Sequence, residues 1–331
     1  MKMLRFISGF HSYKRLAPVC AVILSAWVSP ALADKYPSRT VTFVVPFPAG
    51  SITDTVARSI ANDLQKALGQ TFIIENKPGA QGMLAGSYVA RSAPDGYTLF
   101  FTGNTTHSAA PGLFKTVPYD PIKDFVPVAR IAGFPSFIAV NPSSPIKSIA
   151  ELVAYAKANP GKLSYGHGNS SGQVAIETFK KRLGLDIVRV PYRGNPAVIR
   201  DLIVAQIFMA APDFGTGVPQ VQAQKIRPLA VLTKTRNSAL PDVPTLNETV
   251  LPGFDLIAWT GIFAPAGTPP EIVNTLAKEV EKSLAKPEFK KQFATLGLDV
   301  FWAGPQDYQK YVKTELEKWT GMIKESGIQP E

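Results

Sequence analysis

The chain has 331 residues, of which 45% are hydrophobic and 18% charged, and its formal net charge is +10. This composition excludes a largely disordered protein, and the length predicts about two domains. The single cysteine, Cys20, excludes an intramolecular disulfide, a cysteine-ligated zinc site and an iron–sulfur cluster, and the scattered basic residues argue against a nucleic-acid-binding role.

The first 33 residues have the pattern of a secretory signal peptide. Four basic residues lead into an apolar stretch from Leu16 to Val28, and Ala31-Leu32-Ala33 is a small-x-small cleavage site. We expect cleavage after Ala33 and release into the periplasm, which lowers the net charge from +10 to +6 because these residues contain no acidic group. Val19 before the cysteine disfavours a lipid anchor, and the apolar stretch falls short of the ~20 residues of a membrane span.

Strand and helix patterns then alternate along the chain. The apolar run 41–45 is typical of a buried strand, and it is followed by a helix in which apolar residues recur every four positions between Val56 and Leu68. Ser51 or Thr53 is suited to cap the start of this helix, and Gly69 its end. Further strands are expected at 72–74 and 97–101, on either side of a helix at 82–92. This order predicts a parallel sheet with helical crossovers.

The same alternation returns in the second half of the chain. Helices are expected over 148–159, over 172–183 and from Pro196, with strands over 163–165, 187–190, 207–210 and 228–232. After a Pro-rich loop we expect a strand over 256–263 and helices over 271–284, 288–296 and 306–326. The prediction is an α/β protein with two lobes, each a mixed sheet flanked by helices. The chain is expected to cross between lobes near 137–140 and 256–263.

Ligands of open α/β sheets bind beyond the carboxyl ends of strands, where loops lead into helix N-termini. The first such loop is a candidate binding segment, formed by Phe47, Pro48, Ala49, Gly50, Ser51, Thr53 and Asp54. Gly50 allows close approach of the backbone to a ligand, and Ser51 and Thr53 offer hydroxyl donors. The alternative is an ordinary turn in which these hydroxyls only cap their own helix.

A second loop of the same kind contains Gly168, Asn169, Ser170 and Ser171. It fails as a dinucleotide-binding fingerprint because Ser171 stands where a glycine is needed. It does match the G-x-S-x-G pattern of a hydrolase with Ser170 as nucleophile, but His107 and His167 both precede Ser170, against the usual order of serine, acid and histidine. The remaining interpretation is a nest of hydroxyl and amide donors for an oxyanion.

Four further residues are candidates for ligand binding. Thr102 and Asn104 lie in another polar loop after a strand. Arg193 is suited to pair with a carboxylate, although a solvent-facing arginine is equally compatible with the sequence. Asp213 is suited to hold a water or a ligand amine, or to cap the helix that begins near Gly215. Two histidines make a poor metal site, so no metal is expected.

Several motifs in chain order resemble one family, the Bug-type periplasmic receptors of tripartite tricarboxylate transporters. They are Pro48-Ala49-Gly50-Ser51-Ile52-Thr53-Asp54, Asn76-Lys77-Pro78-Gly79-Ala80, Pro94-Asp95-Gly96-Tyr97-Thr98-Leu99, Val190-Pro191-Tyr192-Arg193-Gly194, Leu240-Pro241-Asp242-Val243-Pro244-Thr245 and Ala264-Pro265-Ala266-Gly267-Thr268-Pro269. The resemblance spans the chain after the signal peptide.

This resemblance implies a venus-flytrap receptor that holds a small organic mono- or dicarboxylate and presents it to membrane subunits, with no catalytic residues and no cofactor. It implies that the loops 48–54 and 168–171 grip the carboxylate, partly through ordered water. We expect a monomer with lobe 1 formed by 34–137 and 258–331 and lobe 2 by 138–257. Ser51 departs from a glycine common in the family, so the particular carboxylate cannot be read from the sequence.

Two other functional classes remain as alternatives. A secreted serine hydrolase would use Ser170 to cleave esters. The effector domain of a bacterial regulator shares such a two-lobed fold, but the signal peptide and the absence of a helix-turn-helix pattern before the domain disfavour it.

Overall fold

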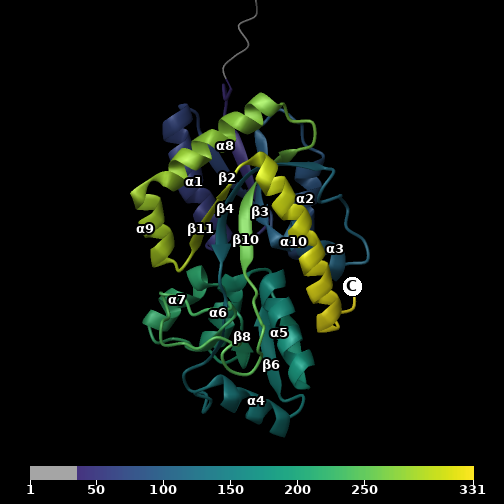
Figure 1. Cartoon of the computed structure of the whole chain (residues 1–331), viewed down its shortest axis with the longest axis vertical. Helices are drawn as coiled ribbons and strands as arrows, with labels where there is room; N and C mark the ends of the chain where they lie inside the picture. The colour runs from purple at the N-terminus through teal and green to yellow at the C-terminus, as the bar shows by residue number, and fades with distance from the viewer. Residues whose placement is uncertain (1–35) are drawn as a thin grey trace, which may run out of the picture. The chain divides into compact units, whose positions relative to one another are not determined.

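Two mixed β-sheets, each with helices on both faces, make up residues 36–331, the part of the chain that this computed structural model describes (Figure 1). The predicted fold class is confirmed. The expected signal peptide and its cleavage site lie outside the described residues. Within residues 36–331, no helix is long and apolar enough to cross a membrane.

The first sheet has six strands in the order β11-β4-β10-β3-β1-β2. Their bounds are β1 Val41–Val45, β2 Phe72–Asn76, β3 Thr98–Gly103, β4 Phe125–Phe134, β10 Ala258–Pro265 and β11 Asp299–Ala303. β1 pairs in parallel with β2 and β3, whereas β10 runs antiparallel to β3 and β4. β1 is apolar and almost entirely buried because helices cover both faces of this sheet.

Different helices cover the two faces of the first sheet. One face packs against α1 (Ile52–Leu68), α8 (Pro270–Ala285) and α9 (Pro287–Thr295), and the other against α2 (Met83–Ala90) and α10 (Pro305–Ser326). Figure 1 shows α1 and α8 together on one side of the strands and α10 with α2 on the other. The apolar residues of α1 that recur every four positions from Val56 to Leu64 enter the core, together with Ile52, Ala57 and Ala61.

The second sheet has five strands in the order β7-β6-β8-β5-β9. Their bounds are β5 Phe137–Val140, β6 Leu163–His167, β7 Ile187–Pro191, β8 Met209–Ala210 and β9 Arg227–Val231. α4 (Ile149–Ala158) and α5 (Ser170–Leu183) pack on one face, and α6 (Asn195–Ile203) and α7 (Phe214–Gln222) on the other.

The chain passes between the sheets twice, at 135–136 between β4 and β5 and at 232–257 between β9 and β10. The long helix α10 packs against both sheets, with Tyr308 in a core of the first and Trp319 in a core of the second. Between them the buried Glu315 accepts hydrogen bonds from the indole nitrogens of Trp259 (3.1 Å) and Trp319 (3.0 Å). That the two sheets move as separate lobes with the boundaries given above stays a prediction.

Four elements were not expected from the sequence. β4 contains Pro127 and is buried on both faces, so it shows no alternation of apolar and polar residues. β11 is a short strand that pairs only with β4. The segment after β3 forms a π-helical turn, Thr105–Ala109, which continues into the short helix α3 (Ala110–Leu113). α5 begins at Ser170, two residues earlier than predicted.

Candidate functional site

A cavity lies where the loops of the two sheets meet. Its volume is about 30 Å³, which is room for about two water-sized groups. The residues that line it come from both sheets and their helices: Phe47, Ser51, Ile52, Thr53, Gly103, Asn104, Thr105, Phe134, Gly168, Asn169, Ser171, Asn195, Asp213, Ala258 and Trp259. We call this space the head cavity.

Four helix N-termini converge on the head cavity. Ser51 caps α1, Asn169 caps α5 and Asp213 caps α7, while Asn195 is the first residue of α6. Each cap accepts a hydrogen bond from a backbone N–H three residues later, at 3.3 Å for Ser51 and 2.9 Å for Asn169 and Asp213. Because a helix N-terminus carries a partial positive charge, their convergence favours a bound anion.

Donors remain available after capping. A cap satisfies the N–H of the third residue, but the N–H groups of the first two helical residues have no partner within the helix. Ile52 and Thr53 hold these positions in α1, and Ser171 holds one in α5. None of the residues that line the head cavity is a lysine or arginine. An anion here would therefore be held by neutral hydrogen-bond donors and helix dipoles.

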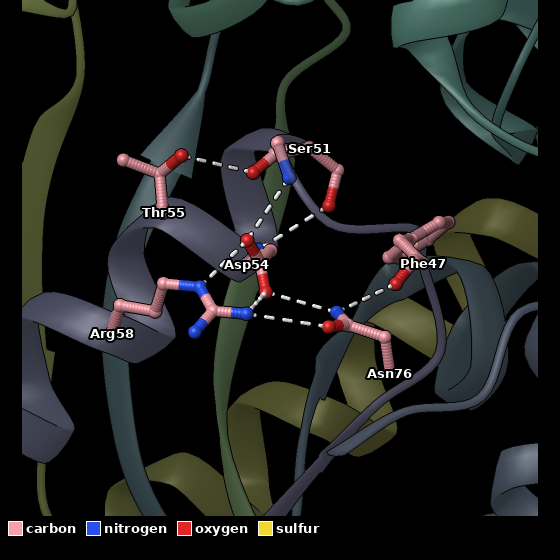
Figure 2. Close-up of polar contacts among 7 residues, drawn as sticks. Phe47, Ser51, Asp54, Thr55, Arg58 and Asn76 are labelled. Atoms are coloured by element: carbon pink, nitrogen blue, oxygen red, sulfur yellow. Dashed lines mark hydrogen bonds and ion pairs between the residues drawn. The ribbon is translucent and has the colours of Figure 1, made fainter. Parts of the chain in front are cut away.

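Asp54 connects the first loop to α1 and β2 through hydrogen bonds (Figure 2). Its carboxylate accepts hydrogen bonds from the Gly50 N–H (3.0 Å), from Arg58 Nε and Nη2 (both 3.0 Å) and from Asn76 Nδ2 (2.9 Å). Asn76 Nδ2 also donates to the carbonyl of Phe47 at 3.0 Å. Partial burial raises the pKa of Asp54, but these hydrogen bonds outweigh it and hold that pKa below its usual value. Asp54 thus fixes the loop and lies outside the cavity lining.

Asn104 joins the two sheets across the cavity. Its Nδ2 lies 3.1 Å from the hydroxyls of both Ser170 and Ser171, and its Oδ1 accepts the backbone N–H of Trp259 at 3.2 Å. The Ser170 hydroxyl is also 2.9 Å from Thr105 Oγ1, and its side chain is fully buried. Ser170 therefore belongs to this contact between the sheets, whereas Ser171 lines the cavity.

No histidine is placed to activate Ser170 within the described chain. His107 bonds through Nδ1 to Thr106 Oγ1 at 3.0 Å and stacks on Phe263 with ring centroids 3.8 Å apart. Burial lowers the pKa of His107 to about 3 and that of His167 to about 4, and neither ring hydrogen-bonds to Ser170. Nothing in residues 36–331 supports the hydrolase alternative, and these residues contain no cluster of three or more metal-binding side chains.

Asp213 is the one ionisable side chain among the described residues that line the head cavity. It is fully buried, and burial raises its pKa above the usual value. Asn195 Nδ2 and the backbone and hydroxyl of Thr216 donate hydrogen bonds to it, which oppose that shift. An ionised Asp213 would disfavour a second anion in the same small space.

The structure gathers about half of the predicted ligand-binding residues around this cavity. Those that line it are Phe47, Ser51, Thr53, Asn104, Gly168, Asn169, Ser171 and Asp213. Those outside the lining are Pro48, Ala49, Gly50, Asp54, Thr102, Ser170 and Arg193. Thr102 is buried beneath the loop, where its hydroxyl lies 2.7 Å from that of Thr106. Contact of any of these residues with a ligand stays a prediction.

The sequence analysis missed seven residues of the lining: Ile52, Gly103, Thr105, Phe134, Asn195, Ala258 and Trp259. Asn195 directly precedes Pro196, where the sequence predicted a helix start, so its place at a helix N-terminus could have been recognised. The pairing of β4 with β10 places Phe134, Ala258 and Trp259 at the cavity. The sequence holds no local signal for this pairing.

Comparison with known proteins agrees with this fold. A family model described as "Tripartite tricarboxylate transporter family receptor" matches residues 56–328. Protein BugT of Bordetella pertussis is 31% identical over 316 residues, which cover 94% of this chain and 97% of BugT. The UPF0065 protein encoded in the tcbD-tcbE intergenic region of Pseudomonas sp. (strain P51) is 33% identical, with 88% of both chains covered.

Solved structures give the same result. Rpa4515 of R. palustris, solved with adipate, is 36% identical with a TM-score of 0.87, covering 89% of this chain and all of that one. MatC of Rhodopseudomonas palustris, solved with malate, is 34% identical with a TM-score of 0.83 over 87% of this chain and all of MatC. The periplasmic binding protein BugD is 33% identical with a TM-score of 0.85, covering 89% of this chain and all of BugD. The chain belongs to the family of tripartite tricarboxylate transporter receptors.

Proposed function

We propose that this protein captures a small organic carboxylate in the head cavity and delivers it to the membrane subunits of a tripartite transporter. The observation that carries the proposal is the convergence of four helix N-termini, from both sheets, on one small cavity. A carboxylate has two oxygens and one negative charge. It matches both the size of the cavity and its supply of neutral donors.

The family and the relatives solved with adipate and malate support a carboxylate as the ligand. The proposal includes binding without turnover, because the Ser170 hydroxyl is engaged by Asn104 and Thr105 and has no histidine partner. It also includes a monomer released into the periplasm after cleavage at Ala33. Amino-terminal sequencing of the periplasmic protein tests the last point, with Asp34 expected first and an intact Met1 against it.

The binding test is calorimetry on protein purified from the periplasm of cells that express the full chain. A panel of mono-, di- and tricarboxylates should contain at least one acid that binds saturably with one site per chain and is recovered unchanged. Absence of saturable binding across the panel contradicts the proposal. Steady hydrolysis of an ester, abolished in Ser170→Ala, would instead support the hydrolase alternative.

Two serine variants test the site itself. Ser51→Ala and Ser171→Ala each remove a hydroxyl donor from the head cavity. Loss of one hydrogen bond to a charged group costs about 1.5 to 3 kcal/mol, which weakens binding roughly 10- to 150-fold.

Ser148→Ala is the matched control for Ser51→Ala. Ser148 caps α4 through the same bond to an N–H three residues later, at 3.2 Å, but it lies outside the head cavity. Both cap variants should lose about 1 kcal/mol of stability, and Ser51→Ala alone should lose affinity. Equal affinities in Ser51→Ala, Ser171→Ala and Ser148→Ala would show that the serines have only structural roles.

A further inference from the structure

A buried carboxylate on α10 holds two tryptophans that belong to different sheets. Glu315 is 5% exposed, and one of its oxygens, Oε2, accepts hydrogen bonds from the indole nitrogens of both Trp259 and Trp319. Trp259 lies on β10 and lines the head cavity, whereas Trp319 is fully buried in a core of the second sheet. α10 itself contacts β4 of the first sheet and α5 of the second (Figure 1). Glu315 therefore connects the wall of the head cavity to the interior of the second sheet.

The acceptor for these two indoles is a charged group. An indole N–H can only donate, so each buried tryptophan needs an acceptor, and a neutral oxygen would meet that need. A buried carboxylate must in addition be hydrogen-bonded and paired to compensate for its lost hydration. Glu315 meets both conditions, because the indoles bind Oε2 and Lys318 Nζ lies 3.7 Å from Oε1. Since bonds to an ionised acceptor are stronger than bonds to a neutral one, the charge holds both rings firmly.

The backbone of Trp259 is held independently of Glu315. Its N–H donates to Asn104 Oδ1 at 3.2 Å, and β3 passes so close that a Cβ added at Gly103 would lie 1.7 Å from the Trp259 carbonyl oxygen. The ring packs edge to face against two tyrosines of α10. Among the described residues, Glu315 accepts the one hydrogen bond that the indole nitrogen makes. Loss of Glu315 would thus free the ring of Trp259 and leave its strand in place.

Trp259 is also connected to the opposite wall of the head cavity. Asn104, which accepts the Trp259 backbone N–H, places its Nδ2 3.1 Å from the Ser171 hydroxyl on α5. A carboxylate in the head cavity would therefore contact both ends of this set of groups, the Ser171 hydroxyl and the Trp259 ring. Because Trp259 and Trp319 share one oxygen of Glu315, a displacement of the first indole changes the hydrogen bond of the second.

We propose that Glu315 is a positioning residue of the receptor. It holds the Trp259 ring as a wall of the head cavity, and it transmits occupation of that cavity to Trp319 in the core of the second sheet. The proposal rests on the proposed function, because it needs a carboxylate in the head cavity. Glu315 does not itself line the cavity, so its effect on a ligand passes through Trp259.

The first test is fluorine NMR on protein labelled with fluorotryptophan. The described chain contains three tryptophans, Trp259, Trp302 and Trp319, whose signals are assigned by replacing each with phenylalanine. The protein is titrated with whichever acid of the calorimetry panel binds, starting with adipate and malate. The signals of Trp259 and Trp319 should both shift with the binding isotherm, while that of Trp302, which packs in the core of the first sheet, stays in place. A Trp319 signal that does not respond to a bound acid overturns the proposal.

Variants of Glu315 then test whether the carboxylate carries this response. Glu315→Leu should abolish the shift of Trp319 and keep that of Trp259, whereas Glu315→Gln retains an acceptor oxygen and should keep both shifts. Glu317→Leu is the matched control, because Glu317 is an exposed residue of the same helix. A Trp319 shift of wild-type size in Glu315→Leu contradicts the proposal. If Glu315→Leu does not fold, the wild-type and Glu315→Gln spectra remain decisive, and absence of the Trp319 shift from both refutes the proposal.

Affinities distinguish positioning of Trp259 from a general effect on the fold. Glu315→Leu should weaken binding roughly 2- to 30-fold, the range for residues that act on a ligand from a distance, and Glu317→Leu should bind as the wild type does. In a Trp259→Phe background no indole remains to be held, so Glu315→Leu should add little further loss. Losses that simply add overturn the role of Trp259 as the link. If calorimetry finds no acid that binds the wild-type protein, the proposed function itself fails.

Discussion

At the scale of single residues, the same side chains that cap the start of a helix also form the candidate site. Ser51, Asn169 and Asp213 each cap a helix and line the head cavity, so the two interpretations left open by the sequence are compatible. A hydroxyl that accepts one bond from its own helix still has a hydrogen to donate. The sequence could identify these residues as caps because the capping patterns are local. It could not reveal that their helices meet.

Asp213 leads to a prediction about pH. Burial raises the pKa of Asp213, so the side chain takes up a proton at a higher pH than an exposed aspartate. As the pH rises through this pKa, Asp213 becomes negative and repels a bound carboxylate. Affinity should therefore fall as the pH rises. An interaction of about 1 kcal/mol, the value for two unit charges 4 Å apart in water, changes affinity about fivefold.

Calorimetry as a function of pH, over the range in which the acid is fully ionised, measures this effect. In Asp213→Asn the affinity should not vary with pH, since an asparagine keeps the cap on α7 and carries no charge. Asp307→Asn is the control, because Asp307 is exposed and pairs with Lys310. Parallel pH profiles in the wild type and Asp213→Asn would show that Asp213 does not face the ligand.

At the scale of elements, a turn and a helix from opposite sheets are joined directly. Gln81, in the turn Ala80–Gly82, donates from Nε2 to Oε1 of Gln173 on α5 at 2.8 Å. Gln81 has a φ of 48°, in the left-handed region that favours glycine. Helices of the two sheets also approach each other closely. A Cβ added at Gly215 on α7, which packs on the second sheet, would lie 2.1 Å from Ile52 Cδ1 on α1, which packs on the first.

Removing the contact between Gln81 and Gln173 should speed release of the ligand. One hydrogen bond contributes about 0.5 to 1.5 kcal/mol, so Gln173→Ala should raise the dissociation rate roughly 2- to 12-fold. Gln292→Ala is the control. Gln292 on α9 donates a hydrogen bond of the same length to Ser59 on α1, and both of these helices pack against the first sheet. Stopped-flow fluorescence measures both rates, and Trp259 in the head cavity is a natural probe. Equal rates in the two variants would exclude a role for this contact.

Elements were predictable where their signals are local. The periodicity of α1 and the capping serine of α4 are present in a few adjacent residues, and both helices begin where expected. β4 was missed because its two faces are both buried and Pro127 interrupts it, so its identity as a strand depends on β10 and β11. The π-helical turn 105–109 likewise depends on packing against α10.

At the scale of the whole described chain, two sheets are connected by two passages, and residues from both sheets line the head cavity. The alternation of strands and helices was enough to predict two α/β halves, and the family motifs predicted the binding-protein fold. The volume of the head cavity was not predictable, because it depends on contacts between residues far apart in sequence. The bond between Asn104 and Ser171 is one such contact.

A ligand that touches both sheets should favour the closed arrangement of the protein. The equilibrium moves by the difference between the affinities of the closed and open states. Small-angle scattering should therefore give a smaller radius of gyration with a saturating acid than without it. Tight binding with unchanged scattering and unchanged amide exchange would contradict closure of two lobes about a hinge.

The central claim is that one carboxylate is held between the two sheets by the N-termini of their helices. Its most direct test is a crystal structure of the periplasmic protein grown with the acid that binds most tightly in calorimetry. We predict one carboxylate group in the head cavity, with oxygens within hydrogen-bonding distance, directly or through one water, of Ser51 on one side and Ser171 on the other. An acid bound elsewhere, or a carboxylate that contacts one sheet alone, would contradict the account.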